Sequence, residues 1–214
     1  MFRNIAQCSE LKLRKLNFEY HKNFQSVNPE LLASALCRVE HVVPSMACLS
    51  DDQLSALFRK INECSELRLK KLNLKDTFYT PIAPSDLASA ICKLEEVNMS
   101  DKDDRDMTFT DDQLNALFSQ IRRCPGLKLR KLAMQFNRVT RVPPSLLASA
   151  LCRLEDVDFR STVMSVDQLI ALFQEIIQSS DLRLRNVYLD KYRGKFPVTP
   201  DVLTEVRSRV SLNS

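Results

Sequence analysis

The sequence predicts an α/β repeat solenoid in which short parallel strands alternate with helices. Three observations support this prediction: an apolar strand motif that recurs at a nearly constant interval, helix-start signals at matching positions of the repeats, and an apolar helical stripe after each start. Because the repeat runs through essentially the whole chain, residues 1–214 are expected to form one domain.

The strand motif has the spacing L-x-x-L-x-L, as in Leu69, Leu72 and Leu74. Its first leucine recurs at Leu13, Leu69, Leu129 and Leu184, in steps of 56, 60 and 55 residues. A second type of unit lies between these copies, at residues 39–42, 94–97 and 154–157. The chain therefore contains about seven strand–helix units of two alternating types. The apolar side of each strand is expected to face inward.

The helix starts follow two patterns, one for each unit type. Ser50, Thr110 and Ser165 each have a glutamine three residues later, at Gln53, Gln113 and Gln168, which is the pattern of a capping box. In the other unit type a proline is expected at the first helical position, where its missing N–H costs nothing. These prolines are Pro29, Pro84, Pro144 and Pro200. Local signals and the global repeat therefore agree.

By these residues the chain resembles the leucine-rich repeat family, and the alternation of two unit types resembles its ribonuclease-inhibitor-like subclass. The resemblance covers essentially the whole chain. It implies a right-handed horseshoe with a parallel β-sheet on the concave face and helices on the convex face. It also implies that the chain binds another protein. The family's usual glycine before the helix, and its Asn or Cys ladder after the strand, are missing from this sequence.

Composition argues against catalysis, cofactors and metals. Only two glycines are present, which excludes a glycine-rich phosphate loop, and the only histidines, His21 and His41, lie in no metal or catalytic motif. Seven cysteines without a CxxC pair favour a reducing compartment. The sequence shows no apolar run near membrane-spanning length and no signal peptide, so the cytoplasm is the expected location.

Two further features have alternative interpretations. Six cysteines fall into register, and we interpret them as small buried residues rather than as metal or redox ligands. They are Cys8, Cys37, Cys64, Cys92, Cys124 and Cys152. An acidic insertion at residues 101–106 is interpreted as a solvated loop rather than a calcium site, because a calcium loop is longer and usually contains glycine.

Outward strand positions predict a charge ladder and a candidate partner site. Lys70 and Lys71 in one unit type alternate with Glu95 and Glu96 in the next, so neighbouring strands are expected to neutralise one another. Exposed aromatic residues on such a face are candidate contact anchors, although partial packing under the loops remains the alternative. The predicted partner-binding residues are Tyr20, His41, Val43, Gln135, Phe136 and Tyr188.

A basic residue precedes the first apolar position of all seven units. These residues are Lys12, Arg38, Arg68, Lys93, Lys128, Arg153 and Arg183. They define a basic edge, for which two interpretations remain open: binding of a polyanion such as RNA or an acidic tail, or stabilisation of helix C-termini. The leading functional hypothesis is therefore a non-catalytic protein-interaction scaffold, and polyanion binding through this edge is the alternative.

The first residues indicate a repeat that has already begun. Residues 2–8 match residues 58–64, so the chain is expected to start inside a helix of a preceding unit. Since solenoids need polar caps, we expect a longer array, end-to-end self-association or a capping partner at this end.

Overall fold

The computed structural model describes residues 2–7, 13–17, 26–43, 49–75, 79, 82–101, 109–190 and 196–213. Within these ranges helices and strands alternate along the chain. The helices are α1 (Phe2–Gln7), α2 (Pro29–Leu36), α3 (Asp51–Glu63), α4 (Pro84–Cys92), α5 (Asp111–Arg123), α6 (Pro144–Leu151), α7 (Val166–Gln178) and α8 (Pro200–Arg209). The strands are β1 (Lys15–Asn17), β2 (His41–Val43), β3 (Lys71–Asn73), β4 (Glu96–Asn98), β5 (Lys131–Ala133), β6 (Asp156–Phe159), β7 (Asn186–Leu189) and β8 (Ser211–Asn213).

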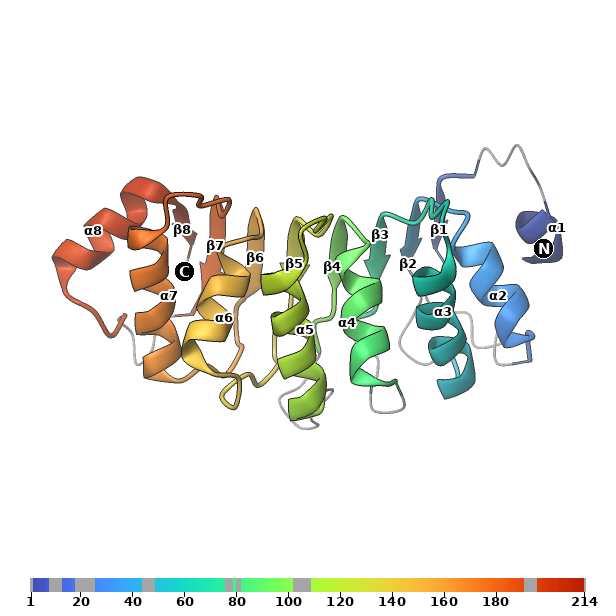
Figure 1. The fold of residues 1–214 in the computed structure, drawn as a ribbon, viewed down its shortest axis with the longest axis horizontal. Helices are drawn as coiled ribbons and strands as arrows, with labels where there is room; N and C mark the ends of the chain where they lie inside the picture. Colours follow the sequence, from blue (N-terminus) through green and yellow to red (C-terminus); the bar gives the residue numbers. More distant parts are fainter. Residues whose placement is uncertain are drawn as a thin grey trace.

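The strands form a single parallel sheet in the order of the chain, β1 to β8. Helices α2 to α7 form a layer over one face of this sheet, as Figure 1 shows. Pairing keeps equivalent residues opposite one another, so that Lys71 pairs with Glu96, Glu96 with Lys131, and Lys131 with Asp156. The predicted solenoid of alternating strands and helices is confirmed.

One strand was not predicted from the sequence. β8 pairs with β7 and places Leu212 opposite Val187. Its apolar residues, Val210 and Leu212, are two positions apart, whereas the corresponding residues Val39 and Val42 of an earlier unit are three apart. This shorter spacing hides the motif.

Both helix-start patterns are confirmed by the caps. Ser50, Thr110 and Ser165 form capping boxes, in which the hydroxyl accepts the N–H of the third helical residue and the side chain of that residue accepts the N–H of the cap. The prolines stand at the first position of α2, α4, α6 and α8. Because a capping side chain satisfies a backbone donor that the helix itself leaves free, Ser50, Thr110 and Ser165 determine where α3, α5 and α7 begin. In the other type the proline at the first helical position has no N–H to satisfy.

The capping glutamines also join each long helix to the unit before it. Nε2 of Gln113 donates to the carbonyl oxygens of Tyr79 (2.6 Å) and Ile82 (2.7 Å). Gln168 donates to the equivalent carbonyls of Val139 and Val142, both at 2.7 Å, and Gln53 donates to that of Val27 at 2.8 Å. All three glutamines are at most 1% exposed. A buried glutamine therefore links successive units in a sequence without the family's Asn or Cys ladder.

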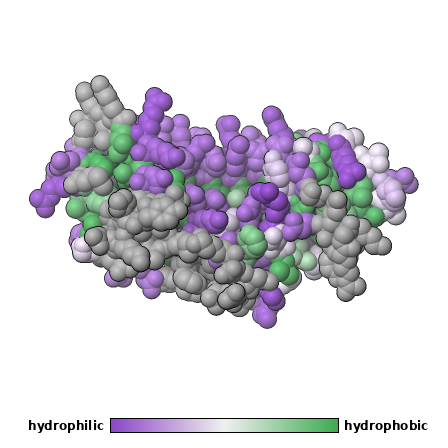
Figure 2. Space-filling view, turned by 180° about the vertical axis from the view of Figure 1, so that it is seen from behind, coloured by the Kyte–Doolittle hydropathy of each residue, from purple (hydrophilic) through white to green (hydrophobic). Residues whose placement is uncertain are grey.

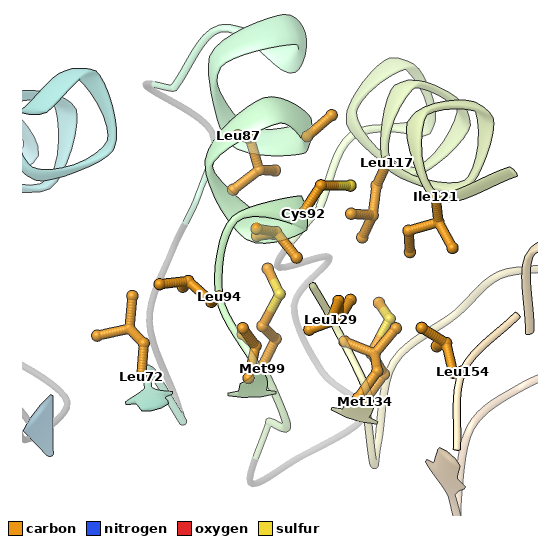
Figure 3. Close-up of a cluster of buried hydrophobic side chains, with 14 of the residues drawn as sticks. Leu72, Leu87, Cys92, Leu94, Met99, Leu117, Ile121, Leu129, Met134 and Leu154 are labelled. Atoms are coloured by element: carbon orange, nitrogen blue, oxygen red, sulfur yellow. The ribbon is translucent and has the colours of Figure 1, made fainter. Parts of the chain in front are cut away.

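The core is continuous between the sheet and the helices. Figure 3 shows Leu72, Leu94, Met99, Leu129 and Met134 on the sheet side, opposite helix residues such as Leu117. Each of these side chains is at most 1% exposed, which matches the expectation that motif residues face inward. In the part of the chain that the structure describes, no helix is long and apolar enough to cross a membrane.

Leu13 departs from the predicted pattern. It is 36% exposed, whereas its equivalents Leu69 and Leu129 are 1% and 0% exposed. The reason is its position next to β1, the edge strand of the sheet, which has a neighbouring strand on one side only. Leu13 is therefore less buried than the repeat predicts.

We expect the substitution Gln113→Leu to lower the free energy of unfolding by about 2–4 kcal/mol. It removes a cap and the side-chain donor to two carbonyls, of which that of Tyr79 keeps the N–H of Ile82. Urea unfolding followed by circular dichroism measures the change. Gln174→Leu, on the exposed side of α7, is the matched control and should cost less than about 0.5 kcal/mol. Equal losses in the two variants would contradict this role of Gln113.

Candidate functional site

The sheet face opposite the helices is called the open face below. It carries the side chains at the third and fifth positions of the L-x-x-L-x-L motif, counted from its first leucine. Figure 2 views the molecule from this side, and the surface between its two ends is mostly hydrophilic. The third position is occupied from β1 to β7 by Lys15, His41, Lys71, Glu96, Lys131, Asp156 and Asn186.

Charges of opposite sign alternate along most of the open face. The Lys71 ammonium lies 2.6 Å from Glu96, and that of Lys131 lies 2.8 Å from Asp156. Second-position pairs are looser, at 3.8 Å between Lys70 and Glu95. The predicted charge ladder is confirmed in this region. Because these side chains are partly exposed, each pair stabilises the fold by at most about 1 kcal/mol.

The residues at the fifth position of the motif lie at or near the ends of the strands. Oδ1 of Asn73 accepts the N–H of Lys75 at 3.1 Å, and Oδ1 of Asn98 accepts that of Ser100 at 3.0 Å. Asp158 does the same for Arg160 at 3.3 Å. Such bonds to the backbone two residues later stabilise tight turns. The column of Asn and Asp therefore has a structural role, which the repetition of these residue types at one position could have indicated.

Ala133 interrupts this column and creates a hollow. It pairs with Asn98 on one side and Asp158 on the other, so a position with a short side chain lies between two longer ones. The missing turn bond is replaced from the neighbouring unit, because Oγ of Ser100 accepts the N–H of Gln135 at 3.1 Å. The hollow above Ala133 has a volume of about 490 Å³ and extends from β4 to β7. Its polar lining includes Asn98, Lys131, Asp156, Asp158, Arg160 and Tyr188.

One wall of the hollow is held in place by a network around Asp158. Arg160 donates to its two oxygens at 3.0 and 2.7 Å, and Gln135 donates at 2.6 Å. The Arg160 guanidinium also lies over the ring of Tyr188, 5.4 Å from its centroid. Burial raises the pKa of Asp158, but the hydrogen bonds from Arg160 and Gln135 outweigh burial, so its pKa lies below the usual range. Asp158 is therefore an ionised anchor for Arg160 and Gln135.

Phe136 projects from the rim next to this network. It is 37% exposed, and its N–H donates to the carbonyl oxygen of Arg160 at 3.4 Å. Its φ of 60° lies in the left-handed region, as does that of Ser161 (56°) at the equivalent turn position of the next unit. A left-handed backbone in a non-glycine residue costs about 1 kcal/mol or more and is often found at functional sites.

The structure brings together only part of the predicted partner site. Gln135, Phe136 and Tyr188 lie around the hollow, together with Arg160 and Asp158, which sequence reasoning missed. His41 and Val43 lie in β2, at a distance along the sheet from Tyr188 in β7. Val43 is only 7% exposed, so it offers a partner little surface, contrary to the expectation. Tyr20 lies outside the described residues.

The predicted basic edge divides by unit type. Arg38, Lys93 and Arg153 each reach back to the helix of the preceding unit. Arg153 donates to the carbonyl oxygens of Ile121 and Cys124 at the end of α5, both at 2.7 Å. These cations therefore satisfy helix-end carbonyls and the helix dipole, as the structural interpretation proposed, but at the neighbouring helix.

The remaining residues of the edge differ. Lys128 and Arg183 are exposed, and Arg68 is half-buried. Lys12 lies outside the described residues. The continuous basic edge inferred from the sequence is therefore interrupted, because in alternate units its cations donate to carbonyls of the neighbouring helix.

The other candidate groups do not form a reactive centre in the described ranges. No cluster of three or more His, Cys, Asp or Glu residues there could hold a metal ion. Burial raises the pKa of the Cys37, Cys92 and Cys152 thiols to about 12, which keeps them protonated. His21, Cys8 and residues 102–106 of the acidic insertion lie outside the described residues.

Two solved structures share this architecture. The leucine-rich repeat-containing protein LegL7 from Legionella pneumophila matches with 15% identity and a TM-score of 0.49, over 90% of this chain and 61% of its own. An internalin (inlF) from Listeria monocytogenes strain 4b F2365 matches with 13% identity and a TM-score of 0.50, over 94% of this chain and 54% of its own. The fold is a leucine-rich repeat solenoid.

This chain spans 61% and 54% of the lengths of these two chains. At such low identities the likeness concerns the fold alone. No protein-family model matches the sequence, and no curated protein sequence matches it.

Arg153→Met should lower the free energy of unfolding by about 1–3 kcal/mol, because the carbonyls at the end of α5 lose a charged donor. Arg183→Met, an exposed member of the same column, is the control and should cost less than about 0.5 kcal/mol. Urea unfolding of both variants measures the difference. A larger loss in Arg183→Met would overturn the division of the basic edge.

The buried thiols should resist alkylation. At about pH 8 we expect iodoacetamide to leave Cys37, Cys92 and Cys152 unmodified in the folded protein, because they are buried and protonated. Peptide mass spectrometry measures the modification at each site, and labelling in urea is the control in which all three should react. Rapid labelling of the folded protein would contradict the placement of these side chains.

Proposed function

We propose that this chain is a non-catalytic protein-interaction module that binds a partner protein on the open face, with the hollow above Ala133 as its anchor point. The observation that carries this proposal is the hollow itself, about 490 Å³ in volume and walled by Tyr188 and Arg160. Tyrosine and arginine are the residue types that most often dominate binding energy at protein interfaces.

The wall of the hollow is ready for binding without rearrangement. Asp158 holds both Arg160 and Gln135, and Arg160 lies against the ring of Tyr188. A partner side chain that enters the hollow therefore meets groups that are already ordered, which reduces the entropy lost on binding. Phe136 adds an exposed aromatic surface at the rim.

The chemistry of the hollow favours binding over catalysis. Among the described residues that line it, there is no serine, cysteine or histidine that could act as a nucleophile or a neutral base. Hydrogen bonds outweigh burial for Asp156 and Asp158, so the pKa of both carboxyls lies below the usual range. Carboxyls that stay ionised near neutral pH are poor general acids.

The alternative of polyanion binding through the basic edge has less support. Arg38, Lys93 and Arg153 are engaged with neighbouring helix ends and would have to leave them to bind a phosphate. Extended repeat solenoids, by contrast, commonly use their sheet face to bind proteins. The cytoplasm remains the expected compartment, from the cysteine pattern alone.

Selection of peptides from a displayed random library against the intact chain tests the proposal. We expect selected peptides to lose at least about 10-fold in affinity on Tyr188→Ala and on Ala133→Arg, which fills the hollow. Tyr188→Phe, which keeps the ring, and Gln174→Arg, which adds the same charge on α7, are the controls and should change the affinity less than about 2-fold.

Two outcomes would contradict the proposal. Selected peptides could bind Ala133→Arg as well as the unaltered chain, in which case the hollow is not the anchor. Alternatively, binding could be lost at physiological salt and on Lys128→Gln with Arg183→Gln, which would favour an electrostatic site on the basic edge.

A further inference from the structure

The charge ladder of the open face breaks at β2. In β4 the third position holds Glu96, between Lys71 and Lys131 of the flanking strands, and in β6 it holds Asp156, between Lys131 and Asn186. In β2 the same position holds His41, which pairs with Lys15 on one side and Lys71 on the other. An imidazole therefore stands where the repeat otherwise has a negative charge.

As a result the open face is electrically polarised along the solenoid. Among the described residues from β1 to the turn after β3, basic side chains on this face outnumber the one carboxylate, Glu40. The basic residues are Arg14, Lys15, Lys70, Lys71 and Lys75. From β4 to the turn after β7 carboxylates predominate. They are Glu95, Glu96, Glu155, Asp156, Asp158 and Asp190, against Arg130, Lys131, Arg160 and Arg185.

The cations nearest His41 differ in their partners. Lys71 is paired with Glu96 across β3 and β4. Arg14 and Lys15 on β1 have no ion pair with any other residue in the described part of the chain. The basic end of the face therefore has positive charge that the ladder leaves uncompensated.

The pKa of His41 reflects the charges on the neighbouring strands. Burial lowers its pKa, and Lys15 on β1 and Lys71 on β3 lower it further, while Glu96 on β4 acts in the opposite direction. Glu40, its neighbour in the chain, is a further described carboxylate of this region. An imidazole with a lowered pKa is neutral near pH 7, and an anion bound over it would favour its protonation.

We propose that the part of the partner that lies over β1 to β3 is an acidic peptide segment, with a carboxylate above His41 between the rows of Lys15 and Lys71. This inference rests on the proposed function, since it concerns the same open face. Adjacent strands are about 4.8 Å apart, so such a carboxylate lies within about one strand spacing of both lysine rows. That distance is shorter than the Debye length of about 8 Å at physiological salt.

The extent of the patch favours a peptide over a nucleic acid. Three strands span only about 10 Å between the first and the third. Beyond them Glu95 and Glu96 on β4 present negative charge. A nucleic acid backbone, which gains affinity from many successive phosphate contacts, would run into these carboxylates. A short acidic segment fits the basic end without reaching them.

Fluorescence anisotropy of a labelled deca-aspartate peptide with the intact chain tests this inference. His41→Glu restores the residue type of the other units, so the fold should tolerate it, and it should lower the affinity at least about 5-fold. Gln174→Glu, which makes the same change of net charge on α7, is the matched control and should change it less than about 2-fold. Thermal unfolding checks that both variants remain folded.

The pH dependence gives a second readout. A carboxylate bound over His41 favours the imidazolium, so lowering the pH from about 7.5 to about 5.5 should increase the protonated fraction of His41 in the complex. Aspartate stays ionised, so the affinity of the unaltered chain should rise. His41→Gln should remove most of this rise. An equal loss in His41→Glu and Gln174→Glu, or a rise of the same size in His41→Gln, would overturn the inference.

Two further binding measurements distinguish this inference from its alternatives. Tighter binding of an oligouridylate RNA than of deca-aspartate at physiological salt, lost on His41→Glu, would replace the peptide by a nucleic acid and overturn the inference. Tyr188→Ala should leave deca-aspartate binding unchanged, because Tyr188 in β7 lies five strands from β2, the centre of the basic patch. The selected peptides could keep their affinity on Ala133→Arg while the affinity for deca-aspartate still falls on His41→Glu. In that case the proposed anchor is wrong and the acidic-segment site is supported.

Discussion

The buried glutamine at the start of each long helix is the interaction on which the rest of this solenoid depends. Its carbonyl oxygen completes the capping box, while its amide donates to the backbone of the preceding unit. In the folded chain those carbonyls are shielded from water, and an unsatisfied buried carbonyl costs about 1–3 kcal/mol. One side chain therefore determines where a helix begins and how it lies against its neighbour.

The regular spacing of the units produces the register of the sheet, and the register produces the properties of the open face. Because equivalent residues stand opposite one another, a repeated alternation of lysine and glutamate becomes a set of ion pairs. For the same reason each departure from the repeat has a local consequence. Ala133 leaves a hollow between two longer side chains, and His41 leaves two lysine rows without a carboxylate between them. The candidate binding features thus lie where the repeat is irregular.

The cations of the chain serve two different purposes. Arg153 and its equivalents stabilise the C-termini of neighbouring helices, where they satisfy carbonyls that the helix cannot. Arg160, by contrast, lies on the open face, where Asp158 holds it over Tyr188. A net charge of +4 therefore says little about binding until each cation is assigned to a role. The arrangement supports a protein partner more strongly than a polyanion along the helix ends.

The sequence by itself determined the repeat, both types of helix start and the alternation of charges, because these signals act over a few residues or recur at a constant interval. Ser50 with Gln53 indicates a cap without any knowledge of the rest of the chain. Contacts between units were decided by the tertiary structure alone. The reach of Arg153 to α5, the burial of Val43, the exposure of Leu13 and the hollow above Ala133 are examples. Each depends on which side chains from segments some 25 to 35 residues apart come to lie side by side, and spacing within one unit does not contain that information.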